Sequence, residues 1–129
     1  MKKQLSILII LLAIAAVIFV GCTPPNAVTR ISAQEAYDMM NELEHYVLLD
    51  VRTQSEFRQN RIQGALLIPH NEIVYRALEE IENKSIVILV YCQAGNRSAV
   101  AAQRLVDLGF LNVYDFGGIN DWTFGTVSG

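Results

Sequence analysis

The sequence has few of the residues that usually bind metals or cofactors. Its 129 residues include two cysteines and two histidines. His45 and His70 have no other ligand-type residue at metal-binding spacing, so neither is assigned a metal-binding or catalytic role. The glycines form no nucleotide-binding motif. The sequence therefore predicts a protein that needs no metal or other cofactor.

Positive charge is also scarce. Ten Lys and Arg residues stand against thirteen Asp and Glu residues, which gives a net charge of −3 at pH 7. Without residues 1–21, which hold Lys2 and Lys3, eight basic residues remain and the net charge is −5. Binding to a phosphate backbone needs clustered basic side chains, and this chain has no such cluster. Nucleic acid is therefore excluded as an expected partner.

The N-terminus carries the one long apolar run of the sequence. Lys2 and Lys3 precede the run 5–20, in which Ser6 is the only polar residue, and this layout is typical of a secretory signal peptide. The segment 19-FVGC-22 resembles the bacterial lipobox, which implies cleavage after residue 21 and lipidation of Cys22. The alternative is an uncleaved anchor, for which the run is near the lower length limit. Both interpretations predict a bacterial protein held at the cell membrane and facing outside the cytoplasm.

Residues 22–30 are interpreted as a linker between the membrane and a single domain formed by residues 31–129. Pro24 and Pro25 lack backbone N–H donors and suit a spacer. A lipidated Cys22 could not form a disulfide, so Cys92 would be a free thiol outside the cytoplasm, where thiols commonly pair. This unusual placement suggests a chemical role for Cys92.

Helices are predicted where a start signal precedes apolar residues at helical spacing. Ser32 with Glu35, and Thr53 with Glu56, have the spacing of capping boxes. Asn71 is predicted to cap a third helix that ends near Ile81. The apolar residues of that helix are expected to share one buried face. These residues are Ile73, Val74, Ala77, Leu78 and Ile81. The other predicted helices run from 33 to 44, for a short stretch after Thr53, and from about Arg97 to Leu108, before Gly109.

Apolar runs between these helices predict strands at 46–51, 64–69, 86–92 and 112–116. The runs are apolar throughout, as expected for strands buried on both faces. Strands and helices alternate along the chain. The predicted fold class is therefore α/β, a parallel sheet flanked by helices on both faces.

Cys92 is the last residue of the strand 86–92, and ligands bind at the carboxyl ends of parallel strands. The loop 93–96 is short and contains Gly95, so its backbone N–H groups can point toward the sulfur. The positive end of the next helix adds to this field. These features predict a lowered thiol pKa and a nucleophilic sulfur. The alternative, an inert cysteine that acts as a small apolar side chain, fits less well beside a glycine and Arg97.

The length of this loop separates two kinds of cysteine enzyme. Four residues lie between Cys92 and Arg97, whereas tyrosine-phosphatase-like enzymes carry five between their cysteine and arginine. The shorter loop makes a tighter ring of amides, which suits one added sulfur atom better than a tetrahedral phosphate.

Four stretches resemble the single-domain rhodaneses, a family of sulfurtransferases. They are 49-LDVRTQSEF-57, 62-IQGALLIP-69, 91-YCQAGNRSA-99 and 117-GGINDW-122, and the resemblance covers about residues 31–122. It implies a rhodanese-like fold, in which Cys92 takes sulfur from a donor such as thiosulfate or a persulfide and passes it to a thiol or cyanide. It implies no cofactor. The substrate-binding residues that it implies are Gln93, Ala94, Gly95, Asn96, Arg97 and Ser98.

Two departures from the family pattern are visible. Thiosulfate-specialised members often have arginine directly after the cysteine, whereas this chain has Gln93. Asn60-Arg61 replace a usual Gly-His pair, a difference that is expected to affect packing. Asp50 and Arg52 are expected to form a buried ion pair or turn hydrogen bonds that hold the loops near the site.

Trp122 is interpreted as a core anchor that closes the domain. Two other functions remain open at this point. One is a phosphatase or arsenate-reductase-like enzyme that uses Cys92, although no aspartic general acid is recognisable in the sequence. The other is a non-catalytic module that binds a partner or senses oxidation through the same thiol.

Overall fold

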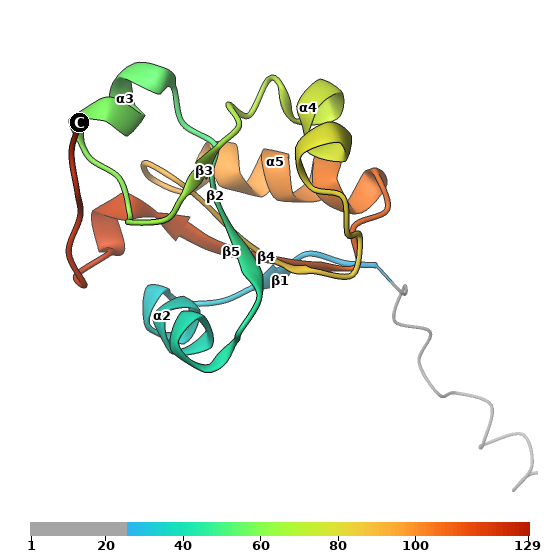
Figure 1. The fold of residues 1–129 in the computed structure, drawn as a ribbon, viewed down its shortest axis with the longest axis horizontal. Helices are drawn as coiled ribbons and strands as arrows, with labels where there is room; N and C mark the ends of the chain where they lie inside the picture. The colour runs from blue at the N-terminus through green and yellow to red at the C-terminus, as the bar shows by residue number, and fades with distance from the viewer. Residues whose placement is uncertain (1–25) are drawn as a thin grey trace, which may run out of the picture.

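The computed structural model describes residues 26–129, which contain one sheet of five parallel strands (Figure 1). The spatial order of the strands is β1-β5-β4-β2-β3. Neighbouring strands are parallel at every pairing. The strands are β1 (Thr29–Arg30), β2 (Tyr46–Asp50), β3 (Leu66–Leu67), β4 (Val87–Cys92) and β5 (Asn112–Gly118).

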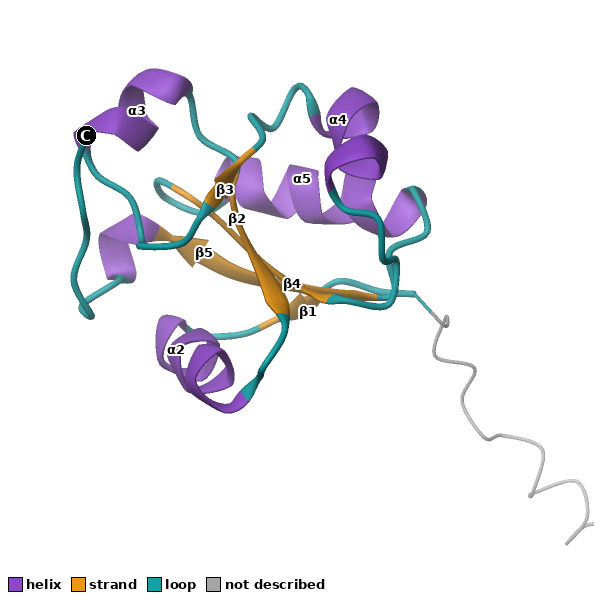
Figure 2. Cartoon of the chain, viewed as in Figure 1, coloured by secondary structure: helices purple, strands orange, loops and turns teal. Residues whose placement is uncertain are grey.

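Helices cover both faces of this sheet (Figure 2). The helices α4 and α5 pack on one face, and α2 packs on the other. A short helix, α3, follows β2, and a single turn of 3₁₀-helix, η2, follows β5. The bounds are α2 (Ala33–Glu42), α3 (Gln54–Gln59), α4 (Ile73–Glu80), α5 (Asn96–Asp107) and η2 (Ile119–Asp121). The predicted α/β class, with helices on both faces of a parallel sheet, is confirmed.

The central strands β2 and β4 are buried on both faces, which explains why all their residues except Asp50 are apolar. Alternate residues of a strand point to opposite sides. Leu49 and Val90 therefore belong to the core under α4 and α5, whereas Leu48 and Leu89 belong to the core under α2. A fully buried side chain of this size contributes about 2 kcal/mol to folding relative to an exposed one.

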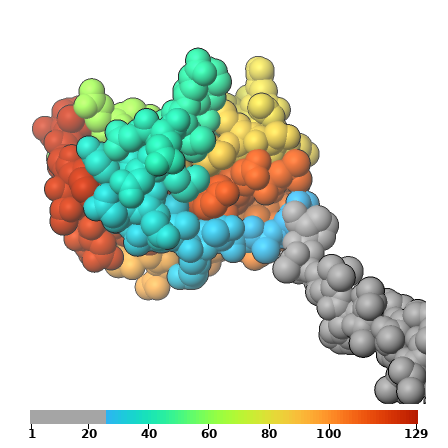
Figure 3. All heavy atoms as spheres, turned by 90° about the horizontal axis from the view of Figure 1, so that it is seen from below, coloured from blue at the N-terminus to red at the C-terminus, as the bar shows by residue number. Residues whose placement is uncertain are grey.

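An aromatic cluster closes the α2 face. The ring of Trp122 lies 5.9 Å from that of Tyr37, 5.7 Å from Phe116 and 5.0 Å from Phe124. Its Nε1–H donates to the carbonyl of Gly125 at 2.9 Å. In the space-filling view, α2 and the C-terminal segment lie side by side (Figure 3). Trp122 is thus the core anchor that the sequence predicted.

Both predicted capping boxes are present. In α2 the Ser32 side chain accepts from the N–H of Glu35, and Glu35 accepts from the N–H of Ser32. In α3, Thr53 and Glu56 make the same reciprocal pair. Because each box uses only side chains and amides within four residues, the local sequence is sufficient to define it.

The prediction for the third helix was partly wrong. Its N-cap is Glu72 rather than Asn71, and no side-chain hydrogen bond caps it. Val74 and Leu78 are 48% and 46% exposed. A helix of eight residues that packs on the sheet through one i, i+4 row leaves the adjacent row in solvent. The buried row here is Ile73 and Ala77.

The first strand was missed in the sequence. Thr29 and Arg30 pair with Tyr114 and Asp115 of β5, although they fall within the stretch 22–30 that was interpreted as a linker. Two residues are too few to show a strand pattern, and their pairing depends on a strand more than eighty positions later. The folded domain therefore begins at or before Thr29.

The predicted signal peptide 1–21, Cys22 and both linker prolines lie outside the described residues. Within residues 26–129, no helix is long and apolar enough to cross a membrane.

Candidate active site

Cys92 lies at the carboxyl ends of β2 and β4, in the centre of the sheet. In the sheet, β2 has β3 on one side and β4 on the other, and β4 lies between β2 and β5. The chain therefore leaves β2 toward β3 and leaves β4 in the opposite direction, toward β5. Such a reversal of strand order is where open parallel sheets bind ligands. Asp50 pairs in register with Tyr91, which brings the two loops that follow these strands together.

A bulge between β4 and β5 shapes the floor of the site. Val90 pairs with Asp115 and Cys92 with Gly118, so β5 contains one extra residue. The Asp115 carboxylate accepts the N–H of Gly117 at 3.0 Å and fixes this bulge. At position 118, a Cβ would overlap the carbonyl of Gln93. Only glycine at that position lets the loop after Cys92 pack onto β5.

The loop 93–95 curls around the sulfur of Cys92. The Gln93 carbonyl accepts the N–H of Asn120 at 3.2 Å, which ties the loop to η2. Gly95 is the N-cap of α5 and has φ +105°, a conformation that side chains disfavour. Its N–H donates to Cys92 Sγ at 3.0 Å.

The thiol of Cys92 is buried and its pKa is lowered. The residue is 1% exposed, more enclosed than a surface nucleophile would be. Burial raises the pKa, but hydrogen bonds from the Ser98 N–H and hydroxyl, and from the N–H groups of Gly95 and Ala94, outweigh it. The net pKa shift is downward, as expected from the sequence.

Ser98 connects the sulfur with the surrounding backbone. Its side chain is fully buried. Its hydroxyl lies 3.0 Å from the Gly95 carbonyl and 3.2 Å from the Gly117 carbonyl, so two oxygens compete with the sulfur for its single proton. The sequence predicted that Ser98 helps to bind a donor; the structure places it beside the Cys92 sulfur.

Arg97 is paired with Glu56. The two guanidinium nitrogens Nη1 and Nη2 each donate to one carboxylate oxygen at 2.8 Å, and both side chains are 28% exposed. Hydrogen bonds from Arg97 lower the pKa of Glu56 to about 2 despite partial burial, and those from Thr53 add to the effect. The same carboxylate raises the pKa of Arg97, to which the charges of Cys92 and Asp50 contribute less.

Arg52 and Asp50 form the expected ion pair, and both are fully buried. Arg52 Nη2 lies 2.7 Å from Asp50 Oδ2. The same nitrogen donates to the carbonyl of Asn60 at 2.6 Å, and Nη1 donates to Gln93 Oε1 at 3.2 Å. The pair thus holds together the loops that follow β2, α3 and β4.

Gln93 is held at both ends of its carboxamide. Besides accepting from Arg52, it donates from Nε2 to Asn120 Oδ1 at 2.6 Å. The sequence assigned Gln93 to substrate binding, and the structure gives its side chain protein partners. Ala94 and Asn96 are exposed at the mouth of the loop.

A family model described as the rhodanese-like domain matches residues 32–124. The chain belongs to the rhodanese-like family. Its fold is that of this family's domain.

Relatives of this rhodanese-like domain include named sulfurtransferases. Thiosulfate sulfurtransferase PspE of Escherichia coli (strain K12) is 34% identical over 86 residues, which cover 67% of this chain and 81% of that protein. Thiosulfate sulfurtransferase GlpE of Coxiella burnetii (strain RSA 331 / Henzerling II) is 33% identical over 94 residues, covering 72% and 85%. A rhodanese structure from E. coli, solved with anions, is 32% identical with a TM-score of 0.62, covering 66% of this chain and all of that one.

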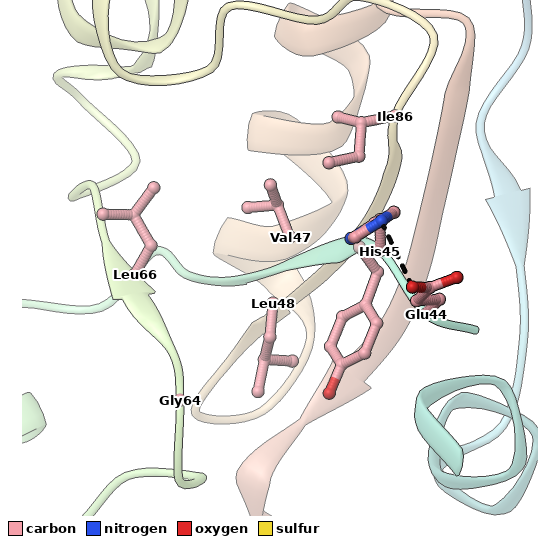
Figure 4. A pocket seen from close by; sticks show the side chains of 8 residues that line it. Glu44, His45, Val47, Leu48, Gly64, Leu66 and Ile86 are labelled. Carbon is pink, nitrogen blue, oxygen red and sulfur yellow. Dashed lines mark ion pairs between the residues drawn. The ribbon is translucent and has the colours of Figure 1, made fainter. Parts of the chain in front are cut away.

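A separate hollow of the rhodanese-like domain lies away from the cysteine (Figure 4). It is lined by Val47 and Leu48 of β2 and by Ile86, at the start of the strands, whereas Cys92 ends β4. Glu44 and His45 also line it, with both side chains exposed and 3.8 Å between Glu44 Oε1 and His45 Nε2. Within residues 26–129, no three His, Cys, Asp or Glu side chains are grouped to hold a metal ion.

Sequence reasoning missed three partners in the site: Glu56 for Arg97, and Arg52 and Asn120 for Gln93. It had assigned Glu56 to the α3 cap alone. The Glu56 carboxylate caps α3 and also pairs with Arg97, because its Oε2 accepts from the Thr53 N–H at 2.9 Å and from Arg97. The motif 49-LDVRTQSEF-57 contains both Arg52 and Glu56, and their partners are 41 positions away.

Proposed function

We propose that this chain is a sulfurtransferase that carries one sulfur atom as a persulfide on Cys92. The thiolate attacks the outer sulfur of a donor, and the donor's S–S bond breaks. The bonding electron pair leaves with the rest of the donor, as sulfite from thiosulfate or as a thiolate from an organic persulfide. An acceptor thiolate or cyanide then attacks the outer sulfur on Cys92 and regenerates the Cys92 thiolate.

The arrangement around Cys92 Sγ supports this proposal. The observation that carries it is the Gly95 N–H at 3.0 Å from the sulfur, which acts with donors of Ala94 in the loop and of Ser98 in α5 to lower the thiol pKa. The same N–H groups suit the persulfide anion that forms after the first step. With Cys92 and the acceptor reacting as anions, neither step requires a separate general base, and the lowered pKa of Cys92 favours the thiolate.

The limited space around the sulfur argues against phosphoryl chemistry. Cys92 is 1% exposed beneath a loop one residue shorter than that of tyrosine-phosphatase-like enzymes. A terminal sulfur atom can be added in such a ring, whereas a phosphoryl group with three oxygens needs more donors and more room.

The test is the mass of the full chain after exposure to thiosulfate or to an organic persulfide. We expect a gain of one sulfur atom, located on Cys92 by peptide mapping and removed by cyanide with release of thiocyanate. The isosteric Cys92→Ser variant should gain no sulfur atom. Because both proteins contain Cys22, the difference between them reports on Cys92. Hydrolysis of a phosphate ester without sulfur loading would instead indicate the phosphatase-like function. Loading without discharge would indicate a sensor or binding module.

We further propose that the chain is attached to the outer side of a bacterial cell membrane. The basic N-terminus, the apolar run 5–20 and the 19-FVGC-22 segment support this attachment. Six residues separate Cys22 from Thr29 of β1, so a tether from Cys22 would keep the domain within about 25 Å of the membrane.

A further inference from the structure

The two arginines that contact the site, Arg52 and Arg97, each have their own carboxylate partner. Arg52 is paired with Asp50 in a fully buried contact, and Arg97 is paired with Glu56 through two hydrogen bonds. These four charges sum to zero. When Cys92 is ionised, the site as a whole is negative by one charge.

Among residues 26–129, the remaining neighbours of the sulfur supply no cation that could offset this charge. The loop residues 93–96 are Gln, Ala, Gly and Asn, and all are uncharged. On the adjacent strand, Asp115 is buried, and its nearest basic group is the mostly exposed Arg30 at 3.9 Å. The attraction that the described part of the site offers to an anion is thus limited to backbone amides and the N-terminus of α5.

We propose that the sulfur donor of this site is an organic persulfide, R–S–SH, in preference to the thiosulfate dianion. This inference rests on the proposed sulfurtransferase function. The Cys92 thiolate attacks the outer sulfur, and the R–S bond to that sulfur breaks. The electron pair leaves as R–S⁻, and the proton stays on the transferred sulfur, giving Cys92–S–SH, which then releases this proton to solvent and becomes the persulfide anion.

Thiosulfate differs in the charge that it brings to the site. It enters with two negative charges and leaves as sulfite with two, and no unpaired guanidinium is available to either. An organic persulfide brings at most one negative charge, and none in the R–S–SH form that the thiolate attacks, so it meets less repulsion than thiosulfate. The relatives named as thiosulfate sulfurtransferases act on thiosulfate by name, whereas the charges of this site favour a different donor.

The test frees Arg97 from its carboxylate. In Glu56→Gln the amide oxygen can still accept the N–H of Thr53, so α3 keeps its cap, but the negative charge is gone. The rate constants for loading of Cys92 are measured by rapid mixing with thiosulfate and with 2-hydroxyethyl persulfide. We expect the thiosulfate-to-persulfide ratio to rise roughly tenfold in the variant, as for one gained charge-assisted hydrogen bond.

The matched control is Glu80→Gln. Glu80 pairs with Arg76 at 2.6 Å on α4, so this change also breaks an ion pair and raises the net charge by one, away from the sulfur. Its loading ratio should equal that of the wild type. An equal rise in both variants would attribute the effect to net charge and overturn the inference.

Salt dependence of the wild type gives a second measurement that needs no variant. Salt screens repulsion between the negative site and thiosulfate, so thiosulfate loading should speed up as ionic strength rises, while persulfide loading should change less because that donor carries at most one charge. Slower thiosulfate loading at high salt would reveal an attracting cation and overturn the inference, as would a wild type that prefers thiosulfate. Failure of both donors to load Cys92 would overturn the proposed function itself.

Discussion

At the scale of single residues, the reactivity of Cys92 depends on a few donors that oppose its burial. Desolvation favours the neutral thiol, whereas N–H groups and a hydroxyl favour the anion. Ser98 supplies both a backbone and a side-chain donor, and it is fully buried. The thiol pKa should therefore respond strongly to this one side chain.

Ser98→Ala is expected to raise the pKa of Cys92. The change removes one donor to the sulfur and leaves the backbone N–H groups in place. The pH profile of Cys92 alkylation by iodoacetamide should move to higher pH, and sulfur loading near neutral pH should slow. Ser32→Ala is the control, because it removes a hydroxyl from the cap of α2, away from the site. An unchanged profile in Ser98→Ala would show that the backbone alone sets the pKa.

Gly118→Ala tests the close approach of β5 to the cysteine loop. Gly118 has φ −125°, which any residue can adopt, so the effect of alanine comes from overlap with the Gln93 carbonyl. We expect the loop to shift, the Cys92 pKa to rise and loading to slow at least about tenfold, as for loss of a donor worth ~1.5 kcal/mol.

Gly125→Ala is the contrasting variant. A Cβ at position 125 would meet open space, but the backbone there has φ +94°. The substitution should therefore cost ~1 kcal/mol of stability and leave sulfur loading of Cys92 unchanged. Equal loading by Gly118→Ala and the wild type would contradict the packing argument.

At the scale of elements, the ion pair between Glu56 and Arg97 joins α3 to the first turn of α5. The carboxylate also caps α3, so a single side chain fixes the start of one helix and the position of another. Because α5 begins directly after the cysteine loop, this contact also constrains the loop.

Stability should depend on pH through Glu56. Its folded pKa is about 2, below the ordinary value of 4.5. A lowered carboxyl pKa adds stability that is present above pH 4.5 and is lost as the pH falls toward 2. After allowance for solvent screening, this contribution is ~1–2 kcal/mol. Urea unfolding at several pH values should show a smaller loss between pH 5 and 2 in Glu56→Gln than in the wild type. Parallel pH curves would contradict this assignment.

The elements also show which parts of the structure the sequence could predict. Ser32–Glu35 and Thr53–Glu56 act within four residues, and the strand 86–92 is apolar throughout, so local patterns were sufficient. The Glu56–Arg97 pair and the Gln93–Asn120 bond join residues 41 and 27 positions apart. The bulge at Gly117 depends on how β5 is aligned with β4. These features arise only when separate segments meet, so neither spacing nor composition indicates them.

At the scale of the whole molecule, the family motifs located the cysteine loop and predicted the fold class correctly. The exposed row of α4 and the short strand β1 were the main errors. Both errors concern residues whose burial or pairing depends on neighbouring elements. A pattern of apolar residues does not show which neighbours are present.

Attachment at the membrane can be tested on the full chain in a bacterial host. With lipidation, Cys22→Ala should abolish labelling by a fatty-acid analogue and leave the signal peptide uncleaved, as measured by intact mass. With an uncleaved anchor, the wild type should already retain residues 1–21 and take up no label. Recovery of unlabelled wild-type protein in the cytosolic fraction would contradict both forms of attachment.

The direction of β1 has a consequence for how the reactive sulfur meets other molecules. Because β1 runs parallel to β5, the chain enters the sheet at the pole where the strands begin, and Cys92 lies at the pole where they end. With the proposed attachment at Cys22, the membrane would hold the domain at the pole where the strands begin, and the cysteine loop would lie on the side away from it. Molecules that give or take sulfur would then approach from the bulk phase or from a facing surface, not from within the lipid layer.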